Sequence, residues 1–349
     1  MSSQASNARI IIKVRYPDGR TYGLLRDAPA MMPSLHGMPL ALQVGVPIGL
    51  LIWLVRGRTA SVSGWLVKTG LVLLYLAAVH LAGLWLLLPW YTAILFATAV
   101  AAVVLTQTPR VRRLPWRAPR LPWSALIWRT TLAVFATGVI AIAFDARRPA
   151  EDEVVDLQFP LRNGVYYVVG GGSAELLNAH LMTLTAERFR AYRGQSYGND
   201  LVKLNAYGMR AAGWLPADPA RYAIYGDPVH APCSGRVVQM EDGLPDMPPP
   251  QPDRTHIPGN HVLLECDGVH VLLAHFQPGT VRVRREQSIE AGAVIGRVGN
   301  SGNSNEPHLH IHAQRPAPAG AEPLSGDPLP IRLGGRYLVR NDRVSATHR

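Results

Sequence analysis

Long apolar runs in the first half of the chain constrain its fold more than any other feature. Four runs follow one another, at residues 39–55, 64–88, 91–107 and 124–144. A helix needs about 20 apolar residues to cross the hydrocarbon layer of a bilayer. Tryptophans, which favour lipid interfaces, gather near the ends of these runs. We therefore expect an α-helical transmembrane bundle in this half; the buried core of a soluble domain is the alternative.

Basic residues are concentrated in the same half. Residues 1–150 carry 16 of the 35 Lys and Arg but only 3 of the 24 Asp and Glu, whereas residues 151–349 are slightly acidic. Positive charge beside apolar runs is typical of cytoplasmic membrane loops. The basicity therefore predicts a lipid bilayer as partner and no nucleic acid.

An arginine-rich stretch at residues 110–120 gives the expected topology. Such a stretch favours the cytoplasm, so the last run delivers everything after residue 144 to the other side. Lys68, near one end of the second run, is expected to reach towards the interface. The run at 39–55 is short and contains Gln43 and Pro47, so three or four helices are expected, with length slightly favouring four.

The chain is expected to divide into five segments. They are a basic N-terminal segment (1–37), a transmembrane region (38–145), a linker (146–160), an all-β domain (161–315) and a C-terminal tail (316–349). In the first segment, two short strands flank a turn at Asp18 and Gly19, which predicts a hairpin.

Residues 161–315 have the pattern of an antiparallel β domain. Short runs rich in Val, Ile, Tyr and Leu alternate with Gly, Pro, Asn and Asp turns. The predicted strands are 164–169, 228–239, 261–266, 270–275, 281–283, 294–298 and 308–313, with a closing strand at 336–340.

Three histidines at every second position indicate chemistry near the end of this domain. Side chains alternate along a strand, so His308, His310 and His312 would share one face. Imidazoles on a rigid strand can bind zinc and serve a water on it. A polar edge strand that happens to be rich in histidine is the alternative.

A catalytic zinc needs three protein ligands and one open position. His310 is the first candidate ligand. Asp200 follows a Gly-containing turn and has apolar neighbours, where a carboxylate needs a partner such as a metal; a turn-capping aspartate is the alternative. His275 ends a predicted strand, from which its side chain can reach a site.

Several motifs in this order resemble the lysostaphin-type (LytM-like) zinc metallopeptidases. They lie at residues 228–238, 259–262, 273–276, 289–302 and 307–310, and the resemblance covers about residues 160–315. It implies a zinc endopeptidase that cleaves peptide bonds in peptidoglycan stems or cross-bridges. His310 and Asp200 would bind the zinc, while His275 and His308 would flank the open position and act on the water. The domain would then lie on the periplasmic side of a bacterial inner membrane, where that polymer is found.

The third ligand departs from the usual family pattern. The family has a histidine four residues before the aspartate, but Ser196 stands there, and a hydroxyl is a poor zinc ligand. Asn178-Ala179-His180 resembles a variant with an upstream asparagine-x-histidine, so the resemblance implies His180 as the third ligand. The alternative is a degenerate site in a domain that binds cell wall or activates another wall hydrolase.

The remaining histidines and the two cysteines complete the expectations. His312 either supports the ligands from behind or is exposed. By the resemblance, Cys233 and Cys266 fall on neighbouring strands, which predicts a disulfide worth about 3 kcal/mol; two buried free thiols are the alternative. The glycines at 170–172 lack the lysine and helix of a phosphate-binding loop.

Overall fold

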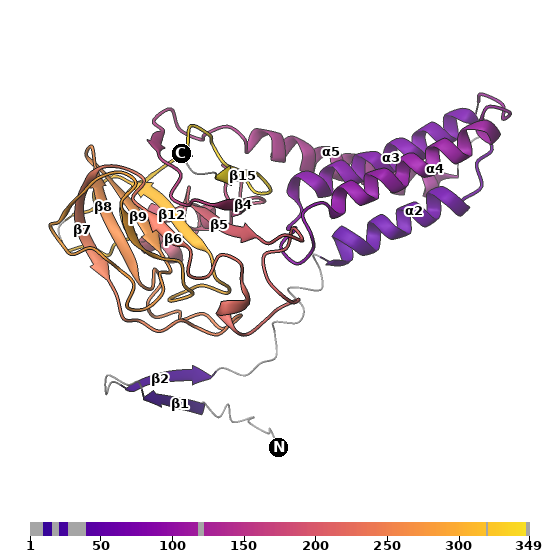
Figure 1. The fold of residues 1–349 in the computed structure, drawn as a ribbon. Coiled ribbons are helices and arrows are strands. Elements are labelled where there is room, and N and C mark those ends of the chain that lie inside the picture. Colours follow the sequence, from indigo (N-terminus) through magenta and orange to yellow (C-terminus); the bar gives the residue numbers. More distant parts are fainter. Residues whose placement is uncertain (1–9, 16–20, 27–39, 118–121, 319, 347–349) are drawn as a thin grey trace, which may run out of the picture. The chain divides into compact units, whose positions relative to one another are not determined.

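The computed structural model describes residues 10–15, 21–26, 40–117, 122–318 and 320–346. The chain forms two compact units, Met1–Val46 and Pro47–Arg349. In the first unit, β1 (Ile10–Arg15) pairs antiparallel with β2 (Thr21–Arg26), which confirms the two strands of the hairpin (Figure 1). The predicted turn at Asp18 and Gly19 lies outside the described residues.

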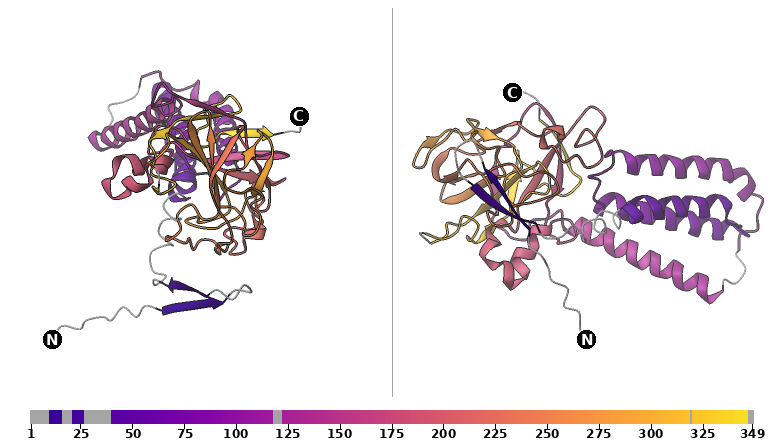
Figure 2. Two further views of the ribbon diagram at one scale, coloured as in Figure 1. Left: turned by 90° about the vertical axis from the view of Figure 1, so that its left-hand side faces the viewer. Right: turned by 90° about the horizontal axis from the view of Figure 1, so that it is seen from below.

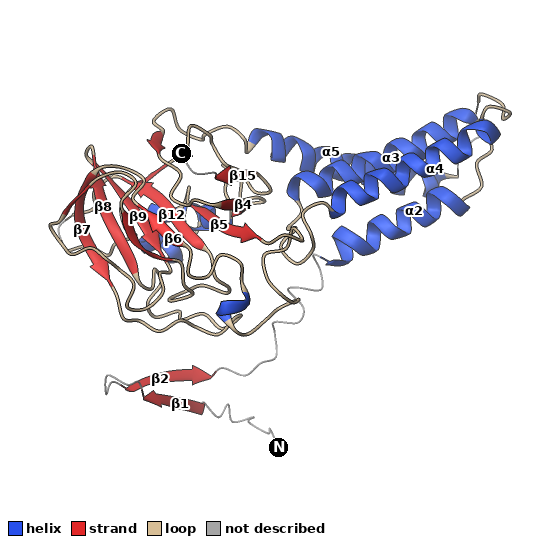
Figure 3. Cartoon of the chain, viewed as in Figure 1, coloured by secondary structure: helices blue, strands red, loops and turns tan. Residues whose placement is uncertain are grey.

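The four longest helices and the strands occupy different parts of the second unit (Figure 3). These helices are α2 (Val46–Arg56, which begins at the unit boundary), α3 (Val62–Ala82), α4 (Thr92–Val111) and α5 (Trp123–Asp145). α3 packs beside both α4 and α5 (Figure 2). By length and composition, α3, α4 and α5 are long and apolar enough to cross a membrane. The apolar helix at Ala41–Arg56, which opens with the π-helical turn η1 (Ala41–Gly45), is shorter.

Lys68 does not reach towards an interface, so this expectation is wrong. Its side chain is 3% exposed, and Nζ donates to the carbonyl oxygens of Gly57 at 2.9 Å and Leu54 at 3.3 Å. The last carbonyls of a helix lack donors within that helix and carry partial negative charge. The buried ammonium of Lys68 therefore caps the C-terminal end of α2.

The described residues of the second half form one large sheet and two small ones, which confirms the predicted all-β class. The order in the large sheet is β10-β7-β8-β9-β12-β5-β4-β15, with β13 also pairing with β12, and every pair is antiparallel. Its strands are β4 (Gly164–Gly170), β5 (Asn199–Leu204), β7 (Gly235–Glu241), β8 (His261–Cys266), β9 (Val269–Ala274), β10 (Ser288–Ile289), β12 (Leu309–Gln314), β13 (Pro328–Leu329) and β15 (Arg343–Ala346). In the small sheets, β6 (Pro228–His230) pairs with β11 (Val294–Arg297), and β3 (Val155–Leu157) pairs in parallel with β14 (Ile331–Leu333).

Three of the predicted strands are wrong. Residues 228–239 form two strands in different sheets, because the chain turns between His230 and Gly235. Residues 281–283 form no strand, although the backbone N–H of Arg282 donates a hydrogen bond to the carbonyl oxygen of Ile295. The tail does close the domain, but with β13, β14 and β15 instead of a strand at 336–340.

The central strand β12 separates the apolar core from the histidine face. Leu309, Ile311 and Ala313 belong to the main core cluster and are fully buried. The alternate positions, His310 and His312, are buried on the opposite face, as the period of two predicts. The predicted disulfide joins Cys233 and Cys266, although Cys233 lies in the β6–β7 connection and not on a strand.

Candidate metal centre

The centre is built on the pairing of β12 with β5. His310 lies directly opposite Asp200 in this register, so the two side chains share one face of the sheet. His310 Nδ1 is 2.8 Å from Asp200 Oδ1, and both side chains are largely buried. Gly198 makes room for the imidazole, because a Cβ at that position would lie 2.7 Å from His310 Cε1.

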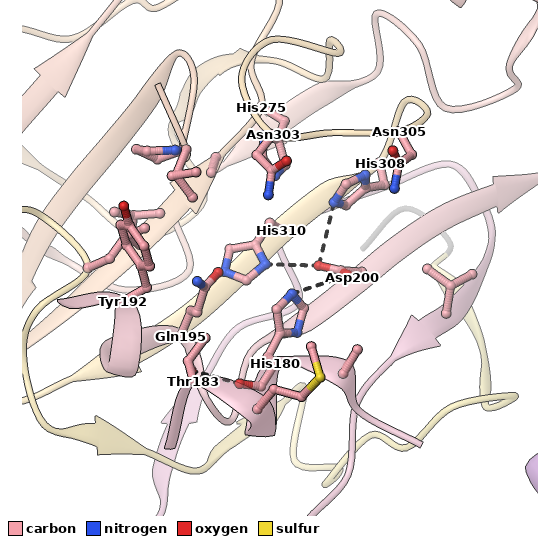
Figure 4. A pocket seen from close by; sticks show the side chains of 18 of the residues that line it. His180, Thr183, Tyr192, Gln195, Asp200, His275, Asn303, Asn305, His308 and His310 are labelled. Atoms are coloured by element: carbon pink, nitrogen blue, oxygen red, sulfur yellow. Dashed lines mark hydrogen bonds and ion pairs between the residues drawn. The ribbon is translucent and has the colours of Figure 1, made fainter. Parts of the chain in front are cut away.

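His180 completes the cluster from outside the sheet. It lies on the short 3₁₀ helix η2 (Ala179–Leu181), which is followed by α6 (Met182–Thr185) and η3 (Glu187–Gln195). His180 Nε2 is 3.4 Å from Asp200 Oδ2, and the candidate ligand atoms of His180, Asp200 and His310 all lie within 4.8 Å of one another (Figure 4). The structure thus brings together the three residues expected to bind zinc.

Asn178 explains why a histidine two positions later faces the carboxylate. Its buried Nδ2 donates to the carbonyl oxygens of Gly172, Ser196 and Gly198 at 3.1 to 3.3 Å. Its Oδ1 is therefore the acceptor for His180 Nδ1, 3.0 Å away. The proton is held at Nδ1, and the Nε2 lone pair is left to face the carboxylate.

Ser196, where the usual family pattern has a ligand, is turned away from the cluster. Its buried hydroxyl donates to the carbonyl oxygen of Arg193 at 2.6 Å and lies 2.9 Å from Thr183 Oγ1. Both contacts lie within the helical segment that carries His180. Ser196 therefore supports this segment and offers no atom to a metal.

His275 and His308 lie side by side next to the trio, with ring centroids 4.7 Å apart. Each Nδ1 is 2.8 Å from a backbone carbonyl oxygen, of Ser301 and Glu306 respectively. Because a carbonyl only accepts, each Nδ1 carries a proton, and in the neutral imidazole Nε2 is then the nitrogen with the lone pair. His275 has a φ of 67°, a left-handed conformation that is costly for a histidine and is often found at functional positions.

His312 is fully buried, which excludes an exposed position. Its Nδ1 lies 2.9 Å from His310 Nε2. Without a metal, the 2.8 Å contact with the accepting Asp200 carboxylate places the His310 proton on Nδ1. With a metal on Nδ1, that proton would lie on Nε2 and be donated to His312 Nδ1. His312 thus supports the candidate ligand from behind, which is the other expected role.

The charges of the cluster suit a divalent cation. Burial, reinforced by the neighbouring His310 and His308, lowers the pKa of His180 to about 4, although Asp200 acts in the opposite direction. Burial raises the pKa of the Asp200 carboxyl, but the surrounding histidines outweigh it and hold that pKa well below its usual range. Burial also holds the pKa of His275 and His312 well below 6.5. Neutral imidazole and ionised carboxylate are the forms in which these groups bind metals.

The donor set fits zinc. Two imidazole nitrogens and one carboxylate are typical of catalytic zinc sites, which keep a fourth position open. Magnesium and calcium prefer oxygen ligands. The Nε2 atoms of His275 and His308 provide two bases beside the trio, and His308 Nε2 is 3.5 Å from Asp200 Oδ1.

A cavity of about 530 Å³ contains this cluster and supplies residues that sequence reasoning missed. Tyr192, Asn303 and Asn305 line it together with the histidines (Figure 4). The asparagines belong to the polar run before His308, which reads only as a loop in the sequence. These polar groups can hydrogen-bond a peptide backbone.

A buried ion pair holds the loop before His308. Arg210, which is 2% exposed, places Nε 2.8 Å from both carboxylate oxygens of Glu306. Glu306 also provides the carbonyl that orients His308. Nothing in the sequence connects two residues so far apart, so this pair is visible only in the structure.

Comparison with known proteins gives one family match. Residues 221–322 match peptidase family M23. This segment contains His275, His308 and His310, whereas His180 and Asp200 precede it. No curated protein matches the chain.

Several solved structures are similar to parts of the chain. The catalytic domain of the antimicrobial peptidase lysostaphin from Staphylococcus simulans is 23% identical with a TM-score of 0.23, covering 35% of this chain and 68% of that one. A zinc-containing peptidase from Vibrio cholerae is 18% identical with a TM-score of 0.21, covering 33% of this chain and 43% of that one. A putative peptidase M23 from Pseudomonas aeruginosa is 17% identical with a TM-score of 0.25, covering 57% of this chain and 59% of that one.

Proposed function

Since residues 221–322 match peptidase family M23, we propose that the chain is a membrane-anchored zinc metalloendopeptidase. Its substrates would be peptide bonds in peptidoglycan stems or cross-bridges. The convergence of His180, Asp200 and His310, with candidate ligand atoms within 4.8 Å of one another, is the observation that carries this proposal.

The side chains around the trio suit peptide hydrolysis. A zinc ion bound there would activate a water and polarise the scissile carbonyl. The hydrogen bonds of His275 and His308 hold a proton on Nδ1, so the Nε2 of either neutral ring can accept a proton from the attacking water. The imidazolium formed in this way can pass the proton to the leaving amine or hydrogen-bond the developing oxyanion.

The helical region supports a periplasmic location for the domain. Three helices are apolar and long enough to span a bilayer, and the arginine-rich stretch between the last two favours the cytoplasm. The segment after α5 then emerges on the extracytoplasmic side of the inner membrane. The disulfide between Cys233 and Cys266 is typical of proteins in oxidising compartments.

A non-catalytic module that binds cell wall or activates another hydrolase is the second candidate. Ser196 favours it, because this serine stands where the usual family pattern has a metal ligand. The position of His180 favours the enzyme, since this residue brings a third donor to the cluster from another segment.

Metal content of the full chain, purified in detergent, tests the proposal. We expect one zinc per chain and release of peptide fragments from purified wall material, followed by mass spectrometry. His180→Ala and His310→Ala should lose both the zinc and the activity, whereas Ser196→Ala should keep its zinc. A parent chain without zinc and without cleavage products would overturn the enzyme in favour of the non-catalytic module.

A further inference from the structure

The connection between α3 and α4 packs directly on the sheet that carries the metal centre. This stretch, residues 83–91, joins two of the candidate membrane spans. Trp85 is buried in a cluster with Tyr167 of β4 and Val202 of β5, the strand of Asp200. The sheet domain therefore contacts the ends of the spans themselves, within one compact unit.

Asn341 fixes this contact at the end of α3. Its Nδ2 lies 2.9 to 3.2 Å from the carbonyl oxygens of His80, Leu81 and Gly83. Its Oδ1 accepts a hydrogen bond of 2.6 Å from the Tyr167 hydroxyl. The side chain thus satisfies carbonyls that a helix end leaves without donors and joins them to the sheet.

A second attachment lies at the end of α5. Arg147 pairs with Asp342 at 3.0 Å. Ala143 and Ala146 pack in a buried cluster with Leu177 and Val339 of the sheet domain. With attachments at the ends of both α3 and α5, the domain is docked on the spans and does not hang on a free linker.

The cavity of the metal centre reaches this contact. Leu86, from the connection between the spans, lines the same cavity as His180, Asp200 and His310. Val169 and Val202, which pack in one cluster with Leu86, also line it. A short connection between two spans lies at the membrane surface, so this part of the cavity lining lies at that level.

An exposed aromatic side chain lies beside the same connection. Tyr207 is 78% exposed, and the following residue, Gly208, accepts a hydrogen bond of 3.3 Å from the backbone N–H of Trp90. A Cβ at Gly208 would lie 2.7 Å from Trp90 Cδ1, so the two segments are in close contact. Tyr and Trp favour the headgroup level of a bilayer.

We propose that, in the membrane, the site acts preferentially on peptides held at the bilayer surface by a lipid anchor rather than on wall polymer further out. This inference rests on the proposed membrane-anchored peptidase. Because the domain is docked on the connection between the spans, the cavity stays at the membrane surface. It cannot move outward to reach a distant substrate. A peptide attached to lipid in the same bilayer is already at the height of the cavity and at high effective concentration.

The height of the substrate can be varied while its anchor stays the same. The full zinc-loaded chain is placed in phospholipid nanodiscs with one bridged stem-peptide dimer in three forms. One form is soluble, one is coupled directly to a phospholipid headgroup, and one is coupled through a rigid ten-proline spacer about 30 Å long. Both anchored forms have the same concentration of anchors in the disc, so they differ only in height.

We expect the directly anchored peptide to be cleaved at least about tenfold faster than the spaced one. Equal or faster cleavage of the spaced peptide would overturn the inference while leaving the proposed peptidase intact. Cleavage of none of the three forms would instead overturn the proposed function, and this inference with it.

Loosening the attachment provides a second test. In the double variant Asn341→Gly and Arg147→Ala, glycine tolerates the positive φ of 75° at residue 341, and both polar attachments are lost. Zinc content and cleavage of the soluble peptide should be unchanged, while the preference for the directly anchored form falls towards one. Arg148→Ala is the matched control, because Arg148 is exposed and neighbours the attachment. An undiminished preference in the double variant would contradict the role of docking.

Discussion

The helical region and the sheet domain both bury charged or titratable side chains, but they satisfy them differently. In the helical region, the ammonium of Lys68 donates to backbone carbonyls at the end of α2. In the sheet domain, His180, Asp200 and His310 turn their candidate ligand atoms towards one another. Burying a polar group is costly unless it finds a partner. Backbone partners indicate a structural role, whereas a cluster of mutually facing titratable groups indicates a place for something bound from outside.

Asp200→Asn should have the largest effect. The amide keeps the shape of the side chain but removes the charge that faces three histidines. We expect loss of stoichiometric zinc and a fall in peptidase activity of about 10³-fold or more. Elemental analysis and a peptide-cleavage assay measure the two effects. Circular dichroism should show an unchanged fold. A full zinc complement in the variant would show that the charge of Asp200 is not needed to bind the metal.

Low pH should destabilise the metal-free chain. The pKa of His180 is about 4 when folded, so between pH 6.5 and about 4 the unfolded chain binds more protons there than the folded chain. Stability therefore falls as the pH is lowered through this window, by about 3 kcal/mol from His180. Buried His275 and His312 act in the same direction. The thermal midpoint of chelator-treated protein at pH 4 to 7 measures the loss, and an equally steep loss in His180→Gln would contradict it.

His312→Leu should weaken zinc binding without abolishing it. The change removes the acceptor 2.9 Å from His310 Nε2, and loss of such an orienting partner typically costs 10- to 100-fold in metal affinity. Competition with a chromophoric chelator measures this affinity. His312→Gln keeps an acceptor oxygen and should restore much of it. Equal affinities in the leucine and glutamine variants would show that His312 only fills space.

Lys68→Met should affect stability alone. It leaves the carbonyls of Leu54 and Gly57 without their buried donor, at a cost of about 1 to 3 kcal/mol. We expect a lower thermal midpoint in detergent, with unchanged zinc content. Arg58→Met is the matched control, because Arg58 is exposed. Loss of zinc in the Lys68 variant would show that Lys68 also supports the metal centre and is not only structural.

Strands with a regular apolar pattern could be predicted from the sequence. β8 has the predicted bounds, and β9 and β12 are each displaced by one residue. β5 was missed as a strand because Asp200 and Lys203 interrupt its apolar pattern. The strands of the tail are short, and β14 and β15 pair with partners far away in the chain, so no local signal reveals them.

Some residues of the candidate site could be predicted from the sequence, and others could not. The alternation of His308, His310 and His312 follows from strand geometry, and a buried carboxylate at Asp200 needs a partner. His180 followed only from a resemblance, because spacing alone cannot place a residue on another segment. The orientation of His180 by Asn178 and the ion pair between Arg210 and Glu306 depend on the folded chain. Lys68 was misjudged because its acceptors belong to a neighbouring helix.

The strand order also affects how the protein is made. β4 and β5 are translated early in the domain, but β15, which pairs with the outer edge of β4, comes from residues 343–346. A nascent chain therefore lacks this edge of the sheet until the ribosome has passed these residues. The edge of the sheet beside β4 and β5, the strand of Asp200, is therefore completed only by residues 343–346.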